Sequence, residues 1–127
     1  MKANGAPAPE VLVVDDDPWI RSLLTDLLTA EGFEVEQASN GPTAVRIANE
    51  HHPDLVLLDL AMPGMSGTQV LRKLKADRDT DEVPVIVVSA YTRHLGRDDA
   101  RLADGIIQKP VDLEDLLARV EHLTRGQ

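Results

Sequence analysis

The chain has 127 residues, of which 43% are hydrophobic, and this suits one domain with an ordinary and largely aliphatic core. The absence of cysteine excludes disulfides, thiolate catalysis and zinc–thiolate sites. The formal net charge of −9 argues against direct binding to nucleic acid, which usually needs a basic face.

Residues 1–9 are rich in Ala and Pro, and we expect a flexible arm there, ahead of one domain that spans residues 10–125. The arm lacks the apolar stretch of a signal peptide. No apolar run elsewhere approaches the ~20 residues that a transmembrane helix needs. We therefore expect a cytoplasmic protein that does not bind membranes.

The first strand is predicted at residues 11–14, which are all apolar. Such continuous runs are typical of strands buried on both faces of a sheet. A helix is predicted next, because Asp17 is a good N-cap, Pro18 suits the first helical position and Gly32 lies where a C-cap glycine is favoured. Its apolar face is predicted, from helical spacing, to comprise Ile20, Leu23, Leu24, Leu27 and Leu28.

Residues 33–38 alternate between apolar and polar types, which is typical of an edge strand, and an amphipathic helix is predicted at 41–51. A second continuous apolar run, at 55–58, predicts another buried strand. The helix after it is expected to begin at about Ser66, which is a favoured N-cap residue.

A third apolar run, at 85–88, predicts a further strand. The segment 92–103 follows, and we expect only a short, mobile helix there because its glycine and aspartates lower helix propensity. The last strand is predicted at residues 106–108. A final amphipathic helix is expected after Asp112.

Strands that alternate with helices predict an α/β fold, with a doubly wound five-stranded parallel sheet and helices on both of its faces. In such folds, ligands bind beyond the carboxyl ends of the strands, where the strand order switches. The residues at the strand ends are therefore the first candidates for a site.

Five side chains able to take part in phosphate chemistry follow the predicted strands. Asp15 and Asp16 follow the first, Asp59 the third, Ser89 the fourth and Lys109 the fifth. Neighbouring carboxylates repel unless a cation neutralises them, and Mg²⁺ takes hard oxygen ligands of this kind together with phosphate oxygens. The sequence thus predicts a magnesium and phosphoryl site.

Roles can be assigned within this set. Asp59 can act as a nucleophile that forms an acyl phosphate, Lys109 can add a compact positive charge, and the Ser89 hydroxyl can donate to a phosphoryl oxygen. A purely structural interpretation exists for each: Lys109 as a solvated lysine before a proline, and Ser89 as a strand-end cap. Asp17 is interpreted as a helix cap.

The sequence resembles the receiver domain of two-component response regulators over about residues 10 to 125. Five motifs carry the resemblance: Val13-Val14-Asp15-Asp16-Asp17, Pro53-Asp54-Leu55-Val56-Leu57-Leu58-Asp59, Met62-Pro63-Gly64-Met65-Ser66-Gly67, Pro84-Val85-Ile86-Val87-Val88-Ser89-Ala90 and Lys109-Pro110. The resemblance implies a flavodoxin-like fold with the strand order 2-1-3-4-5.

The resemblance also implies the ligands of a metal. Asp59 would be the phosphoacceptor, charged by the phosphohistidine of a sensor kinase or a phosphotransfer protein. Asp16 and Asp59 would bind Mg²⁺ directly, Asp15 would bind it through water, and the backbone carbonyl of Ala61 would complete the set.

The resemblance further implies a switch that acts on an unknown downstream protein. Ser89 would move toward the phosphoryl group, Lys109 would pair with it, and the Lys109–Pro110 bond would be cis. The protein would be a signalling module rather than an enzyme, and either a monomer or a homodimer that forms on phosphorylation.

Three departures from the family pattern bear on the switch. Ile106 occupies the position at which most receivers carry a switch aromatic, and Tyr91 is either a replacement for it or an ordinary loop aromatic. The interval from Ser89 to Lys109 is shorter than expected, and the glycine expected after the fourth helix is missing. The chain also stops soon after the fifth helix, as expected either of a stand-alone receiver or of an excised fragment.

The sequence also bears on three other functions. An aspartyl-phosphate phosphatase would need a second carboxylate two residues after the nucleophile, where this chain has Ala61. A receiver-like scaffold that works without phosphate is favoured by Ile106 but not by the complete set of charged residues. A flavin-binding protein would need a phosphate-binding loop after Val14, where acidic residues occur instead. Ala61 also predicts slow loss of the phosphoryl group, over minutes or longer.

Overall fold

The computed structural model describes residues 7–90 and 95–126. Within them, five parallel strands form one sheet in the order β2-β1-β3-β4-β5, which confirms the predicted topology. The strands are β1 (Glu10–Val14), β2 (Glu34–Ala38), β3 (Leu55–Leu58), β4 (Val85–Ser89) and β5 (Gly105–Gln108). The helices are α1 (Pro18–Ala30), α2 (Gly41–His51), α3 (Gly67–Ala76), α4 (Arg97–Leu102) and α5 (Leu113–Arg125).

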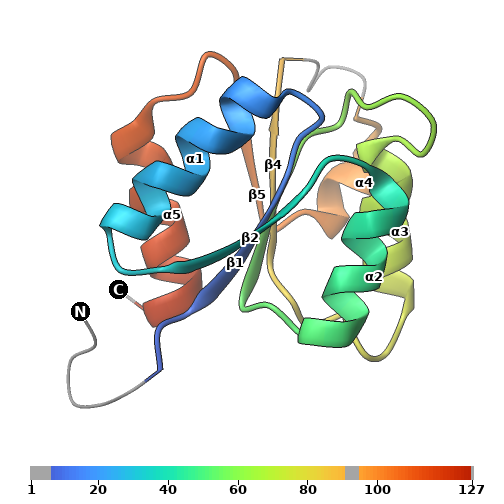
Figure 1. Ribbon diagram of the computed structural model, residues 1–127. Helices are drawn as coiled ribbons and strands as arrows, with labels where there is room; N and C mark the ends of the chain where they lie inside the picture. The colour runs from blue at the N-terminus through green and yellow to red at the C-terminus, as the bar shows by residue number, and fades with distance from the viewer. Residues whose placement is uncertain (1–6, 91–94, 127) are drawn as a thin grey trace.

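The helices form two layers around the sheet: α1 and α5 cover one face, and α2, α3 and α4 lie against the other (Figure 1). Alternate residues of each central strand point into opposite layers. In β1, for example, Val11 and Val13 pack with α1 and α5, whereas Leu12 and Val14 pack with α2 and α3. The continuous apolar runs follow from this burial on both faces.

The ends of α1 are fixed by the predicted residues. The Asp17 side chain accepts a hydrogen bond from the Trp19 amide, and Pro18 opens the helix. Gly32 has φ +92°, and the amides of Gly32 and Phe33 donate to the carbonyls of Thr29 and Leu28. This double hydrogen bond closes the helix and requires the left-handed conformation that glycine adopts without strain.

The later helices also begin at predicted caps. Ser66 forms a capping box with Gln69 at the start of α3, and Asp112 accepts hydrogen bonds from two amides of α5. The helix α4 has only six residues, as the weak propensity of its segment predicts. All six lie in the described part of the chain, and none of them is buried.

One predicted core residue is wrongly placed. Leu24 and Leu28 of α1 are buried, but Leu23 is 50% exposed and its neighbour Trp19 is 81% exposed. Successive helical residues lie about 100° apart around the axis, so a stripe centred on Leu24 and Leu28 turns Leu23 toward solvent. The two side chains together form an exposed apolar patch on α1.

Parts of the chain lie outside the described residues. Residues 1–6 of the predicted arm and Tyr91, the proposed substitute for the switch aromatic, are among them. Across residues 7–90 and 95–126, none of the helices has the length and apolar character needed to cross a lipid bilayer.

Candidate metal centre

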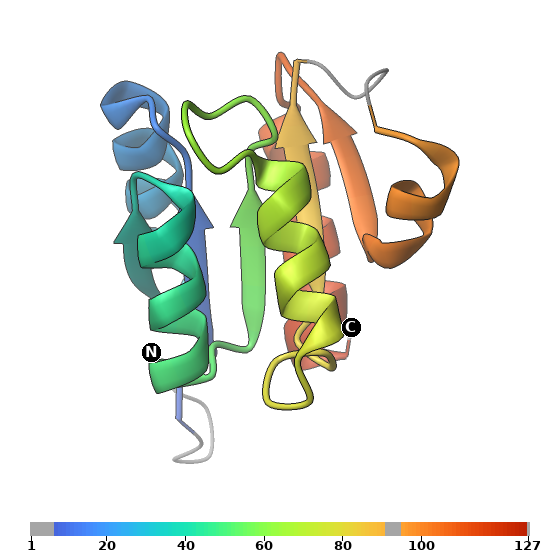
Figure 2. The same cartoon turned by 90° about the vertical axis from the view of Figure 1, so that its right-hand side faces the viewer.

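The sheet register brings the predicted site residues to one edge. Val14 pairs with Leu58, so Asp15 and Asp59 leave adjacent strands side by side, and the Asp59 amide donates to the Val14 carbonyl. On the next pair of strands, the Lys109 amide donates to the carbonyl of Ser89 at 3.1 Å. The strand arrowheads all point toward this edge (Figure 2).

Three carboxylates meet at this edge. One carboxylate oxygen from each of Asp15, Asp16 and Asp59 lies within 4.8 Å of the other two. Asp15 and Asp59 are 3% and 6% exposed, whereas Asp16 is open to solvent. Two buried oxygen donors beside one accessible donor fit Mg²⁺, which takes carboxylate ligands but keeps several waters.

Lys109 lies between the two buried carboxylates. Its ammonium nitrogen is 3.1 Å from Asp15 Oδ2 and 3.8 Å from Asp59 Oδ1. The ammonium therefore offsets part of the repulsion within the cluster, and the shorter distance shows that its hydrogen bond goes to Asp15. The Lys109–Pro110 peptide bond is cis, as the resemblance implied.

The carboxyl group of Asp59 has a raised pKa. Burial is the main cause because it disfavours the charged form, and repulsion from Asp15 acts in the same direction. The Lys109 ammonium and hydrogen bonds from the Ala61 amide and the Ser89 side chain oppose this shift. Asp59 is thus a desolvated carboxylate surrounded by groups that stabilise negative charge.

Asp15 is held in place by contacts that the sequence did not predict. The Asp17 amide donates to Asp15 Oδ1 at 2.9 Å, which orients the carboxylate. The Arg21 guanidinium donates to the Asp15 carbonyl at 2.8 Å and to the Gln37 side chain at 3.0 Å. Sequence reasoning missed Arg21, although its place one turn into a helix that starts beside Asp15 was a usable signal.

Gly67 is the second residue whose role was missed, although it closes one of the five motifs. A Cβ atom built on Gly67 would lie 2.0 Å from the Asp59 carbonyl oxygen and 2.5 Å from Leu60 Cα. The Gly67 amide donates to the Leu60 carbonyl at 2.9 Å. The first residue of α3 is therefore packed directly on the backbone that carries Asp59.

Two further predictions concern Ile106 and Ala61, which are not among the side chains that directly follow the strands. Ile106 is partly buried and packs against the core beneath α2 and α3. The Ala61 amide donates to Asp59, while the role of the Ala61 carbonyl as a metal ligand stays a prediction.

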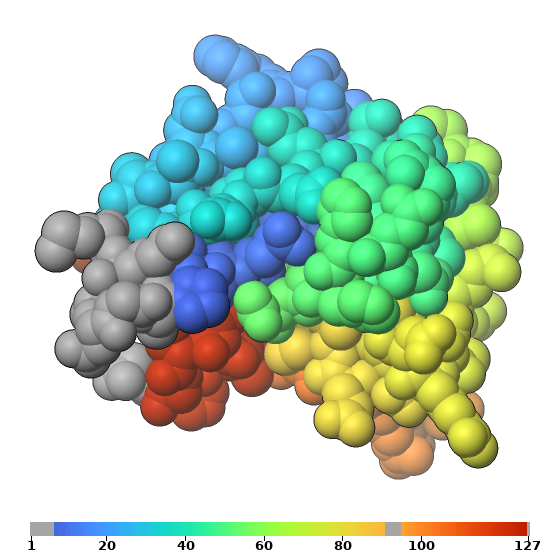
Figure 3. Space-filling view, turned by 60° about the horizontal axis from the view of Figure 1, so that its bottom comes forward, coloured from blue at the N-terminus to red at the C-terminus, as the bar shows by residue number. Residues whose placement is uncertain are grey.

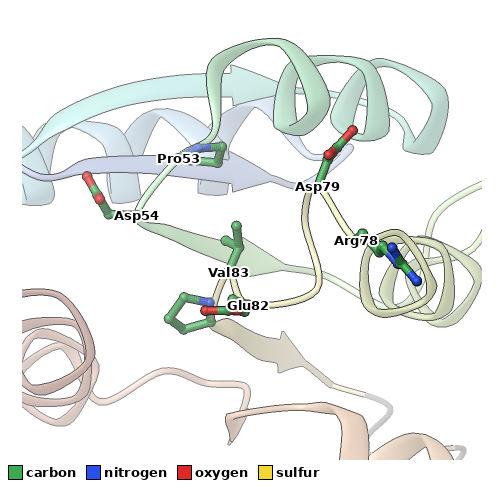
Figure 4. A pocket seen from close by; sticks show the side chains of 7 residues that line it. Pro53, Asp54, Arg78, Asp79, Glu82 and Val83 are labelled. Carbon is green, nitrogen blue, oxygen red and sulfur yellow. The ribbon is translucent and has the colours of Figure 1, made fainter.

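A hollow of about 340 Å³ lies away from this cluster. It is lined by residues that precede β3 and β4, such as Pro53, Asp54 and Pro84 (Figure 4). The hollow therefore opens at the amino ends of the strands, opposite Asp59 and Ser89. Figure 3 views the molecule from this side, where the segment before β4 (yellow) lies near the end of α2 (green).

Comparisons with known proteins agree with this geometry. Residues 11–121 match the family model of the response regulator receiver domain. The chain is similar to the response regulator PleD of Caulobacter vibrioides, with 44% identity over 120 residues that cover 91% of this chain and 26% of PleD. It is also similar to Protein PilH of Pseudomonas aeruginosa, with 36% identity over 118 residues, 91% of this chain and 98% of PilH.

Among solved structures, that of the response regulator TrrA from Thermotoga maritima in complex with Mg(2+)-BeF matches with a TM-score of 0.83 and 33% identity. That match covers 91% of this chain and 98% of TrrA. The chain thus spans about a quarter of the length of PleD and nearly all of PilH and TrrA.

Proposed function

Because this chain belongs to the response regulator receiver family of two-component signalling, we propose that Asp59 accepts the phosphoryl group from a phosphohistidine of a sensor kinase or a phosphotransfer protein. The observation that supports this most is the position of Asp59. Its nearly buried carboxylate lies within 4.8 Å of two other carboxylates and 3.8 Å from an ammonium group.

The transfer uses Asp59 as a nucleophile. A carboxylate oxygen forms a bond to phosphorus while the phosphorus–nitrogen bond of the donor breaks, and the electron pair returns to the imidazole, which takes up a proton. The amide of Ala61 and the hydroxyl of Ser89 already donate hydrogen bonds to Asp59, so they are placed to hold this carboxylate during the attack.

Asp15, Asp16, Asp59 and the carbonyl of Ala61 are the proposed ligands of Mg²⁺. When bound, the ion supplies positive charge that offsets the charge of the phosphoryl oxygens. Lys109 now pairs with Asp15, and we propose that its ammonium turns to the phosphoryl group after transfer.

The rest of the proposal concerns the whole protein. We propose that residues 10–125 form the receiver unit and that residues 1–9 are an arm outside it. The unit would act as a switch for a downstream protein rather than as an enzyme, because Ala61 offers no general acid. It would work in the cytoplasm, without direct binding to nucleic acid or membrane, as a monomer or as a homodimer that forms on phosphorylation.

Acetyl phosphate with Mg²⁺ should add one phosphoryl group to the wild type and none to Asp59→Asn, as read by intact-protein mass spectrometry. Asp26→Asn is the matched control, because Asp26 is an exposed aspartate of α1 away from the site. Equal labelling of the wild type and Asp59→Asn refutes the assignment.

The competing function is a scaffold that works without phosphate, and Ile106 is the observation that favours it. Titration with Mg²⁺ separates the two. Trp19 is joined to the site through Asp17, which accepts from the Trp19 amide and donates to Asp15. If the site is functional, millimolar Mg²⁺ should change the Trp19 fluorescence of the wild type, and replacement of Asp16 by Asn should abolish the change.

A further inference from the structure

We propose that Arg72 of α3 is a positioning residue that couples the phosphoacceptor end of β3 to α4. The proposal rests on the proposed function of Asp59. It supplies a route from the site to α4 that does not need an aromatic side chain at position 106. The route has three parts: a contact between Asp59 and α3, the rigid helix α3, and an ion pair between α3 and α4.

The first part is the packing of α3 on the phosphoacceptor backbone. Gly67 lies so close to Asp59 and Leu60 that no side chain fits between them. The hydrogen bond from the Gly67 amide to the Leu60 carbonyl fastens the two segments together. A rearrangement of the backbone around Asp59 therefore moves the start of α3, because the contact has no free space to absorb it.

The second part is the helix itself. Its first turn is closed by the reciprocal hydrogen bonds of Ser66 and Gln69, and its apolar side, including Val70, Leu71 and Leu74, is fully buried. Arg72 lies five residues beyond Gly67, about 7.5 Å along the axis at 1.5 Å per residue. A capped and well-packed helix transmits a displacement over this length as a rigid body.

The third part is the ion pair between Arg72 and Asp99. Arg72 Nε lies 2.8 Å from Asp99 Oδ1, and Arg72 Nη2 lies 2.7 Å from Asp99 Oδ2. This two-pronged geometry fixes orientation as well as distance, which a lysine could not do. The Asp99 side chain is only 14% exposed, so the carboxylate faces α3 rather than water. The two helices lie next to each other in Figure 2.

The helix α4 has few other contacts besides this pair: Leu102 and the flanking Leu95 and Ala103, all partly buried, pack against the core. None of its residues, all within the described ranges, is buried, and its N-cap residue Gly96 has no side chain to cap the helix. One turn farther along α3, Lys75 binds Asp104 at 2.9 Å, just before β5. Asp104 also accepts from the Val85 amide and donates its own amide to the Val85 carbonyl, so this point is fixed to the sheet.

The two contacts therefore have different consequences. The Lys75–Asp104 contact fixes the segment after α4 to the sheet, whereas the Arg72–Asp99 pair joins α4 to a helix that touches Asp59. Removing the Arg72 guanidinium should leave the fold and the site intact but separate α4 from events at Asp59.

The test compares the wild type with Arg72→Gln and with the control Arg46→Gln, which removes an exposed pair with Glu50 within α2. The probe is Mg²⁺ with beryllium fluoride, which mimics a phosphoryl group on a carboxylate. Its affinity is read from Trp19 fluorescence, and the response of α4 is read as amide hydrogen exchange over residues 97–104. The chain is used in full.

In the wild type and Arg46→Gln, the probe should change exchange over residues 97–104. In Arg72→Gln this response should be lost. The probe should also bind more tightly, by about fivefold, because binding no longer has to displace α4 and coupling between sites is reciprocal. If Arg72→Gln only loosened α4, without any coupling to Asp59, the affinity for Mg²⁺ with beryllium fluoride would not change. Asp99→Asn should act like Arg72→Gln, and the double variant should add nothing.

Two outcomes overturn the inference, and they differ. If Arg72→Gln keeps the wild-type affinity or the wild-type response of α4, the inference is wrong while the proposed function of Asp59 stands. If the probe leaves Trp19 fluorescence and the exchange of the wild type unchanged, the proposed function is wrong and the inference fails with it.

Discussion

Replacement of Gly67 by alanine tests the contact between α3 and the end of strand β3 that carries Asp59. The added Cβ would lie 2.0 Å from the Asp59 carbonyl oxygen, whereas Cβ atoms essentially never come closer than 3.0 Å to a neighbouring atom. The start of α3 must therefore retreat by about 1 Å, because the opposing atoms are backbone and cannot rotate away.

Two effects of opposite sign determine how Gly67→Ala changes the free energy of unfolding. Alanine is a better helix former than glycine by about 1 kcal/mol. Overpacking of a tight contact costs about 1–3 kcal/mol and more when backbone has to move. The clash should win, so we expect a loss of about 2 kcal/mol in the free energy of unfolding. For a domain of this length that lowers Tm by about 8 °C.

The assay is thermal and urea unfolding followed by circular dichroism, together with the rate of labelling by acetyl phosphate. A displacement of 1 Å at a reacting group can slow a reaction by about 100-fold, so labelling should fall more than stability alone explains. The control is Gly96→Ala, because the nearest atom to a Cβ there is 4.0 Å away. Wild-type stability in Gly67→Ala would refute the tight contact and, with it, the first step of the coupling route.

Three further predictions concern the charges of Asp59 and Asp99 and the lifetime of the acyl phosphate. Because burial raises the pKa of Asp59, its ionised form destabilises the fold at neutral pH in the presence of a chelator. Asp59→Asn should therefore raise the free energy of unfolding by about 1 kcal/mol under these conditions, and this gain should shrink as the pH falls through the raised pKa of Asp59. A gain that grows on acidification would contradict the prediction. The hydrogen bonds from Arg72 lower the pKa of Asp99, so the pair stabilises α4 above the ordinary carboxyl pKa of 3.8, and this stabilisation is lost as the pH falls through the lowered value. The protection of the amides of residues 97–104, measured relative to their intrinsic exchange rate at each pH, should then fall in acid in the wild type but not in Arg72→Gln. The acyl phosphate should persist for minutes or longer, since Ala61 has no polar side chain to orient an attacking water, and loss of label within seconds would contradict this.

The fold was predictable because its signals are local. The central strands could be located from continuous apolar runs, since each of their residues packs against one of two helical layers. The caps Asp17, Ser66 and Asp112 bind amides two or three residues away, so a short stretch of sequence contains the whole interaction. The exposure of Leu23 was not predictable in the same way, because it depends on how α1 is rotated against the sheet.

The residues of the site fall into the same two groups: those whose placement follows from the strands, and those whose placement depends on how the helices pack. The meeting of Asp15, Asp59, Ser89 and Lys109 at one edge was predictable because parallel strands bring their carboxyl ends together, whatever the connecting helices do. The contacts of Arg21 and Arg72 join residues whose meeting depends on helix placement. A pattern at one position gives no sign that its partner lies 27 residues away, as it does for Arg72 and Asp99.

The charges at this edge of the sheet explain why Lys109 pairs with Asp15. Three carboxylates and one ammonium leave a formal deficit of two positive charges, which one divalent cation would balance. The ammonium lies beside Asp15, the more deeply buried of its two partners, where it offsets the cost of an unpaired buried charge. If Mg²⁺ binds as proposed, the cation would take over that role and free the ammonium, and a phosphoryl group on Asp59 would then be the strongest nearby anion. On this proposal the same lysine would stabilise the carboxylate cluster and recognise the phosphoryl group, and its partner would be set by where the uncompensated negative charge lies.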